Sequence, residues 1–163
     1  MPREKGIQFL PLVKEVYNPV FRDFGFEIQE EAEWDGHGEY TVIASKGEMS
    51  LVFYLGLVPL FYYFDIGIKL SGSLAKKLTS DLYHQKHSIG MMAIANHLNS
   101  DYKPQKRGNQ TKEELINAME KRKEDLLQYC SDILAGDISI LSDVVSDLVG
   151  QRKNSSFKAP KHN

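Results

Sequence analysis

The first amphipathic stretch of the chain lies near its N-terminus and predicts a helix. Pro11 suits a first helical turn, whereas Pro19 removes a backbone hydrogen bond and predicts a kink, or a short break near Asn18. Gly25 predicts the end of this helix. The apolar positions recur every three or four residues, which is the spacing of one helix face: Phe9, Leu12, Val13, Val16, Tyr17, Val20, Phe21 and Phe24.

Alternation of apolar and polar residues begins directly after Gly25 and predicts strands. In the first strand, one set of alternate positions is mostly glutamate and glutamine, which indicates a solvent-exposed face. The other set of alternate positions carries Phe26, Ile28, Ala32 and Trp34. A turn cluster follows at 35–38, and further strands are expected over 40–45, 49–55 and 60–70. The last two strands have apolar residues on both faces, so we expect them in the middle of the sheet or covered on both faces. Short turns between four strands predict an antiparallel meander.

Helical periodicity returns after Gly72 and continues to the last apolar residues. Helices are expected from Ser73 through Leu82, over 89–98, and from a capping box at Thr111–Glu114 to Gly136. Asp137 predicts the cap of a final helix. A helix, then strands, then helices predicts an α+β fold with the C-terminal helices on one face of the sheet. We expect a single domain over 1–150 and a disordered basic tail over 151–163.

Composition narrows the setting without identifying an activity. The single cysteine, Cys130, excludes an internal disulfide, and the start of the chain shows no signal segment, so we expect a cytoplasmic protein. The run from Met49 to Phe64 has no charged residue, but it is too short for a membrane span and is interrupted by Gly56 and Pro59. It predicts a buried hairpin, and we expect no membrane partner.

Sequence motifs for catalysis are absent, and catalytic residues stay unknown. Cys130 falls on the apolar stripe of a helix, as a small hydrophobe does. Asp65 is a charge within a very apolar strand, and we expect it on the less buried face or at a strand end rather than in catalysis. No cofactor is predicted. A metal site is an alternative in which His84, His87, His97 and Asp81 would supply ligands, although nothing in the spacing shows that they converge.

The distribution of charge is more informative than any motif, although the net charge is only −2. Seven acids and one base, Lys46, lie between residues 27 and 48. A basic loop at 103–112 and the basic tail lack interleaved aromatic residues, so we do not expect a nucleic-acid partner. Acidic surfaces attract basic proteins. The predicted partner-binding residues are Glu30, Glu31, Glu33, Trp34, Asp35 and Glu39.

Three stretches together carry a resemblance to a known group. They are Phe21-Arg-Asp-Phe-Gly25-Phe26, the paired strands from Tyr40 to Leu70, and the helix-to-helix junction Leu127–Ser139 with Gly136 and Asp137. The chain resembles a broad group of small, poorly characterised bacterial α+β proteins, some of which are similar to immunity proteins. That resemblance implies a protein that neutralises a toxin by binding it, and it implies no catalytic residues.

The sequence therefore favours a binding module of immunity type, which occludes a basic partner through its acidic hairpin. Two alternatives stay open. One is a metal-assisted enzyme that uses the region of His84, His87 and His97. The other is a homo-oligomeric structural protein that associates through an exposed part of an aromatic surface: Phe53, Tyr54, Phe61, Tyr62 and Tyr63.

Overall fold

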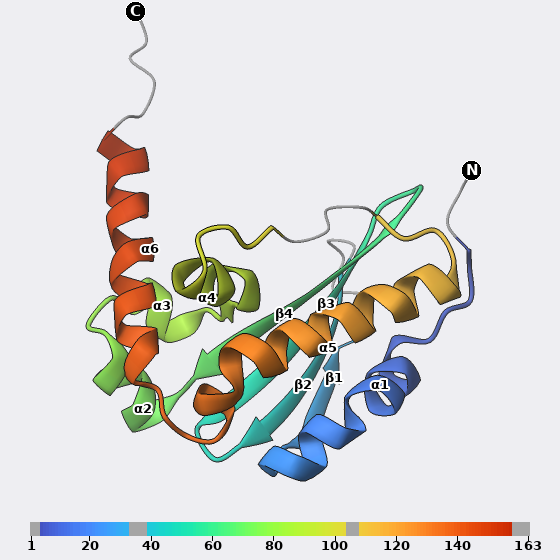
Figure 1. Ribbon diagram of the computed structural model, residues 1–163, viewed down its shortest axis with the longest axis horizontal. Coiled ribbons are helices and arrows are strands. Elements are labelled where there is room, and N and C mark those ends of the chain that lie inside the picture. Colours follow the sequence, from blue (N-terminus) through green and yellow to red (C-terminus); the bar gives the residue numbers. More distant parts are fainter. Residues whose placement is uncertain (1–3, 33–38, 104–107, 158–163) are drawn as a thin grey trace, which may run out of the picture.

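The computed structural model describes residues 4–32, 39–103 and 108–157, with the backbone alone at 30–32 and 155–157. It confirms the α+β fold, with one helix, a five-stranded antiparallel sheet and then the C-terminal helices (Figure 1). The elements are α1 (Phe9–Phe24), β1 (Glu27–Ala32), β2 (Glu39–Lys46), β3 (Met49–Leu57), β4 (Tyr62–Leu70), α2 (Gly72–Leu78), α3 (Leu82–Lys86), β5 (Ile89–Gly90), α4 (Met91–Leu98), α5 (Lys112–Leu134) and α6 (Ser139–Phe157).

The sheet has its strands in sequence order, so the predicted four-stranded meander is confirmed. A fifth strand, β5, adds to it by pairing Gly90 with Gly67 and Ile89 with Ile68. The sequence predicted a helix from residue 89, but α4 begins only at Met91. Two paired residues are too few to show an alternating pattern, so a strand of this length has no signal in the sequence.

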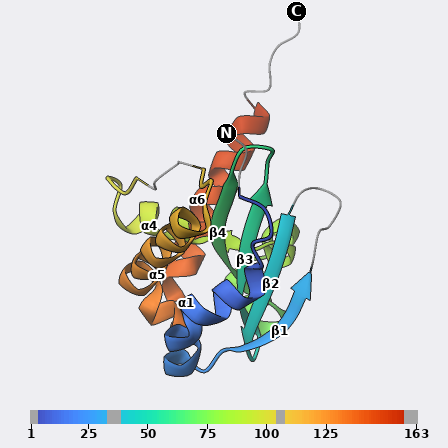
Figure 2. The ribbon, with the colours of Figure 1, turned by 90° about the vertical axis from the view of Figure 1, so that its right-hand side faces the viewer.

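Helices α1 and α5 cover one face of the sheet, and Figure 2 shows this layering edge-on. Tyr17 of α1 is fully buried against the sheet. Its ring centroid lies 4.7 Å from that of Phe53 on β3 and 6.1 Å from that of Phe64 on β4. Its hydroxyl donates to the Met119 carbonyl of α5 at 2.7 Å. One side chain of α1 therefore contacts β3 and β4 and bonds to α5.

The single helix predicted from Ser73 through Leu82 is wrong. α2 begins at Gly72, after an N-cap at Ser71 whose side chain makes no capping hydrogen bond, and it ends at Leu78 before α3 begins at Leu82.

Three other helix ends follow the predicted capping chemistry. The Gly25 N–H donates to the Phe21 carbonyl at φ 82°, and the Thr111 hydroxyl accepts from the Glu114 N–H at 3.1 Å. The Asp137 carboxylate accepts from the Ser139 N–H at 3.0 Å. No break occurs near Asn18, since α1 is continuous with Pro19 inside it. Burial of the apolar face on both sides of Pro19 stabilises the helix against the lost hydrogen bond.

The predicted domain end at residue 150 does not coincide with an element end, because α6 continues to Phe157 and projects from the body (Figure 1). Its buried residues, Leu141, Val144 and Val145, all lie in the first half. Beyond residue 150, Arg152 binds Asp81 at the start of α3 and lies 4.7 Å from the Tyr83 ring. No helix of the described chain is long and apolar enough to cross a membrane.

Replacing Tyr17 by Phe should lower the free energy of unfolding by about 1 kcal/mol, because the buried Met119 carbonyl then loses the hydrogen bond that it accepts in addition to its helical one. Urea denaturation of both proteins measures this difference. Tyr83→Phe is the matched control, because Tyr83 is exposed and should change stability by less than about 0.5 kcal/mol. Equal stabilities for Tyr17→Phe and the parent would contradict the role given to the hydroxyl.

Candidate functional site

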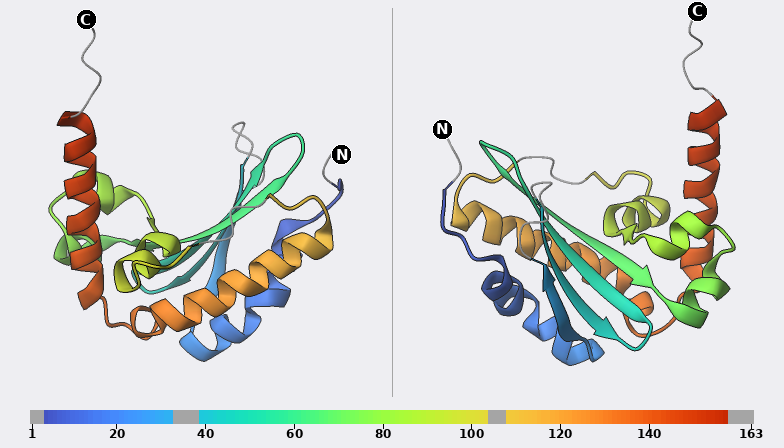
Figure 3. Two further views of the ribbon diagram at one scale, coloured as in Figure 1. Left: turned by 45° about the horizontal axis from the view of Figure 1, so that its top comes forward. Right: turned by 180° about the vertical axis from the view of Figure 1, so that it is seen from behind.

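The second face of the sheet carries the candidate site, because α1 and α5 leave it uncovered along most of its length (Figures 2 and 3). Strand register places Thr41, Tyr54 and Asp65 side by side across this face. We call it the open face. Its described side chains are Glu27, Glu39, Thr41, Ile43, Ser45, Ser50, Val52, Tyr54, Tyr63, Asp65 and Lys69.

The open face is acidic. Its described side chains include three carboxylates, those of Glu27, Glu39 and Asp65, and one base, Lys69. Lys46, the only base between residues 27 and 48, lies on the covered side, where its ammonium donates to the Leu134 carbonyl and lies 5.2 Å from the Phe26 ring. The base that would offset the acidic segment is therefore directed away from the open face.

The six predicted partner-binding residues are only partly placed. Glu39 is half-buried on the open face, opposite Gly56. The backbones of Glu30 and Glu31 pair with Ile43 and Val42, while Glu33, Trp34 and Asp35 lie outside the described residues.

A β-bulge interrupts the alternation predicted across the first strand. The register shifts between Ile28 and Glu30, so that Ile28 pairs with Ala44 whereas Ala32 pairs with Thr41. Ala44 belongs to the core and Thr41 to the open face, so the pairing of the β1 backbone does not keep the single parity that the sequence predicted. The extra residue, Gln29, is polar like Glu30 after it, so the insertion leaves no clear mark in the sequence pattern.

Asp65 lies on the less buried face of its strand, as predicted. It lies in the middle of β4 rather than at a strand end. It is half-buried, and its Oδ1 accepts from the Ile66 N–H at 2.8 Å. Burial raises the pKa of the Asp65 carboxyl, against the opposing effects of that hydrogen bond and of the Arg122 charge. Ionisation of the Asp65 carboxyl on the open face therefore costs stability.

Tyr54 joins the open face to the segment before β5. Its hydroxyl and that of Ser88 share a hydrogen bond of 2.8 Å. Ser88 lies directly over Gly67, where an added Cβ would be 2.5 Å from the Ser88 Oγ. The glycine therefore permits the close approach that fixes Ser88 and, through it, the Tyr54 ring.

The connection between β3 and β4 is exposed, although the run from Met49 to Phe64 predicted a buried hairpin. The two strands are largely buried as expected. Val58 and Leu60 in the connection are 38% and 46% exposed, and Tyr63 at the start of β4 is 45% exposed. Reciprocal backbone hydrogen bonds between Val58 and Phe61, at 3.2 and 3.3 Å, define the turn.

The aromatic surface predicted for self-association does not form as one patch. Phe53 and Tyr62 are buried, because alternate residues of a strand point to opposite faces. Of the five aromatic residues, only Tyr63 is strongly exposed.

The three histidines of the metal hypothesis have separate neighbours. His84 is buried with its Nδ1 3.4 Å from Asp81, too poorly aligned for a hydrogen bond. The His87 ring packs edge-on against Tyr83. The His97 Nδ1 lies 2.6 Å from the Asp147 carboxylate of α6. Within the described residues no three His, Cys, Asp or Glu side chains are grouped as a metal site requires.

A buried polar network on α5 was missed from the sequence. The Tyr102 hydroxyl donates to the Asp125 carboxylate at 2.8 Å and accepts from Arg122 at 3.2 Å. Burial and the bond to Asp125 raise the pKa of Tyr102 to about 12. The signal was a pair of charges at helical spacing within the apolar stripe, between Met119 and Leu126. The network fixes the segment after α4 against α5, on the covered side of the sheet.

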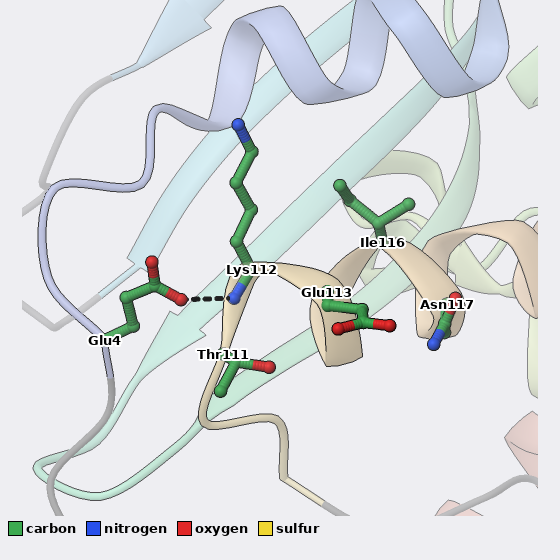
Figure 4. Close-up of a pocket in the computed structure, with 6 residues that line it drawn as sticks. All are labelled: Glu4, Thr111, Lys112, Glu113, Ile116 and Asn117. Carbon is green, nitrogen blue, oxygen red and sulfur yellow. Dashed lines mark hydrogen bonds between the residues drawn. The ribbon is translucent and has the colours of Figure 1, made fainter.

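Two hollows lie elsewhere in the described chain, and each is lined in part by charged or polar side chains. Figure 4 shows one at the start of α5, where the Glu4 carboxylate accepts from the Lys112 N–H at 2.7 Å and so caps the helix itself. The other, about 130 Å³ between α4 and α6, contains the His97–Asp147 pair. Within the described chain, the lining of this second hollow includes no Ser, Thr, Cys or Lys side chain.

Comparison of the chain with protein-family models, with curated proteins and with solved structures finds no match. We therefore infer function from the geometry and charge of the open face.

Replacing Asp65 by Asn should raise the free energy of unfolding at pH 7 by about 1 kcal/mol or less, because Asn keeps an acceptor for Ile66 and removes a charge that burial disfavours. Since the pKa of Asp65 is raised in the folded state, the parent loses stability relative to the variant as pH rises through the ordinary aspartate range. The difference should vanish at lower pH, where the carboxyl is protonated.

Thermal or urea unfolding across pH 3–7 measures this trend, and Asp23→Asn on the exposed surface of α1 is the matched control. A destabilised Asp65→Asn protein at pH 7 would show that the ionised carboxylate supports the fold.

Proposed function

We propose that this protein is a protein-binding module that engages a basic partner through the open face and the adjoining acidic segment 30–39. The observation that carries the proposal is the half-buried Asp65 carboxylate, which lies on an uncovered sheet face beside Tyr54. A carboxylate kept in place against its own burial cost is typical of functional sites.

Charge and side-chain type both support a basic protein as the ligand. Glu27, Glu39 and Asp65 give the described open face its acidic character, and Lys46 does not offset it because it lies on the covered side. Complementary charge speeds encounter and selects the partner. Tyr54 and Tyr63 add amphipathic rings of the kind that often supply binding energy in protein interfaces.

The immunity type is the form of this proposal that we favour. In that mechanism the acidic surface covers the basic active-site surface of a toxin and excludes its substrate. The resemblance of the chain to immunity-like proteins and its charge distribution support this mechanism. One free cysteine, buried in the core, is consistent with action in the cytoplasm, where the partner would be neutralised before it acts.

The variant E30K/E33K/D35K should lose a basic partner that the parent retains, because it reverses the acids without altering the described core. The measurement is a pull-down with tagged protein from a lysate of the source organism, at low and high salt, with mass spectrometry. We expect one stoichiometric basic protein that is released by salt.

A charge-matched control, E124K/D132K/D143K, changes three exposed acids of α5 and α6 and should retain the partner. Equal retention by the two triple variants, or equal loss, would argue against an acidic binding surface at 30–39.

A further inference from the structure

Strand β1 forms one edge of the sheet, and its outer side has no partner strand within the described chain. β2 is its only neighbour in the strand order, and Figure 2 shows β1 at the margin of the sheet with no helix beyond it. Glu27 and Gln29 of this strand are exposed to solvent. An edge strand presents a row of unpaired N–H and C=O groups, which is a template for a further strand.

The opposite edge of the sheet, along β4, is partly occupied by the chain itself. The short strand β5 pairs with Gly67 and Ile68, and Tyr62 exchanges backbone hydrogen bonds of 2.7 and 2.9 Å with Asn109. The backbone of β1 makes no such outer hydrogen bond to any described residue. Of the two edges, β1 is therefore the one that the described fold leaves open.

The charge of β1 determines which kind of strand fits this edge. Three of its six residues are glutamate and none is basic. The bases that flank it are engaged elsewhere, since Arg22 lies 3.3 Å from Asp23 and Lys46 bonds to a carbonyl of α5. Like charges on facing strands repel each other, whereas opposite charges stabilise the pair. The edge therefore disfavours a second copy of β1 and favours a basic segment.

The β-bulge of β1 limits the length of any strand that is added. Residues 30–32 keep an unbroken register with β2, whereas the register shifts between Ile28 and Glu30. Bulges increase the local twist and interrupt pairing, which also protects an edge strand from aggregation. An added strand would therefore be short, and we expect a dissociation constant on the order of micromolar or weaker.

We propose that the partner of this protein supplies an extended, basic segment that pairs with β1 as a sixth strand of the five-stranded sheet. This inference rests on the proposed function and specifies how the basic partner binds. Backbone hydrogen bonds along the edge would fix the register of the added strand, and its lysine or arginine side chains would lie beside the glutamates of β1. The added strand would also extend the open face, on which Tyr54 and Asp65 lie.

Hydrogen exchange of the full chain, with a short synthetic peptide of alternating lysine and threonine, tests the proposal. The peptide should slow exchange of the β1 amides at low salt, because outward N–H groups gain hydrogen bonds. The same peptide with every backbone amide methylated keeps its charge but cannot pair as a strand, since it has no N–H donors. It should leave β1 exchange unchanged, and mass spectrometry of fragments that contain residues 27–32 measures both effects.

The variant E27K/E31K should weaken binding of the unmethylated peptide by about tenfold or more, because it replaces opposite charges by like charges along the edge. The matched control E124K/D132K changes two exposed acids of α5 and should bind the peptide like the parent. Titration with the peptide, followed by the same exchange measurement, gives the affinity of each protein.

Equal slowing of β1 exchange by the methylated peptide would overturn strand addition, while binding through charge, and with it the proposed function, would stand. Unchanged β1 exchange with the unmethylated peptide, or an E27K/E31K variant that binds like the parent, would also overturn it. Slowing that increases with the concentration of the protein alone would overturn it too, because a second copy would then occupy the edge. Failure of the proposed function is recognised separately, as a pull-down that retains no basic protein.

Discussion

The buried contact of Tyr17 with the sheet and with α5 is the interaction on which this architecture depends. Its ring packs on Phe53 and Phe64, and its hydroxyl donates to the Met119 carbonyl. One side chain of α1 therefore contacts two central strands and α5. Because α1 and α5 both lie on the same side of the sheet, the fold has a covered face and an open face (Figure 2). The functional proposal follows from that asymmetry.

An uncovered sheet face is expected to be polar, but this one is also acidic. Lys46 lies on the covered side, while Asp65 remains on the open face although burial raises its pKa. A mixed charge pattern would keep such a face in solution and discourage aggregation equally well. The imbalance of charge, together with Tyr54 and Tyr63, is the basis on which we propose a binding surface here.

The sequence predicted those elements whose signals are local. The apolar period of α1, the capping box of α5 and the meander of four strands each depend on neighbouring residues, and each is confirmed. Features that depend on distant contacts were not predictable. The bulge after Ile28 is set by pairing with β2, and the two-residue strand β5 exists only because β4 offers an edge.

The same distinction applies to the candidate site. His84 and His87 are close in sequence, yet the first is buried beside Asp81 and the second packs on Tyr83. Asp65 could be singled out from its apolar neighbours, because a charge in such a strand always requires an explanation. The exposure of Val58 and Leu60 could not, since an apolar turn and a buried strand have the same composition.

The most direct test of an acidic binding surface is a titration with a synthetic lysine peptide, followed by the fluorescence of Trp34. Trp34 is the only tryptophan of the chain and belongs to the predicted partner-binding segment, so its emission reports on that segment alone. We expect a saturable change in emission at low salt that high salt abolishes. Emission that stays constant while the peptide binds elsewhere, or an absence of binding at low salt, would contradict the account.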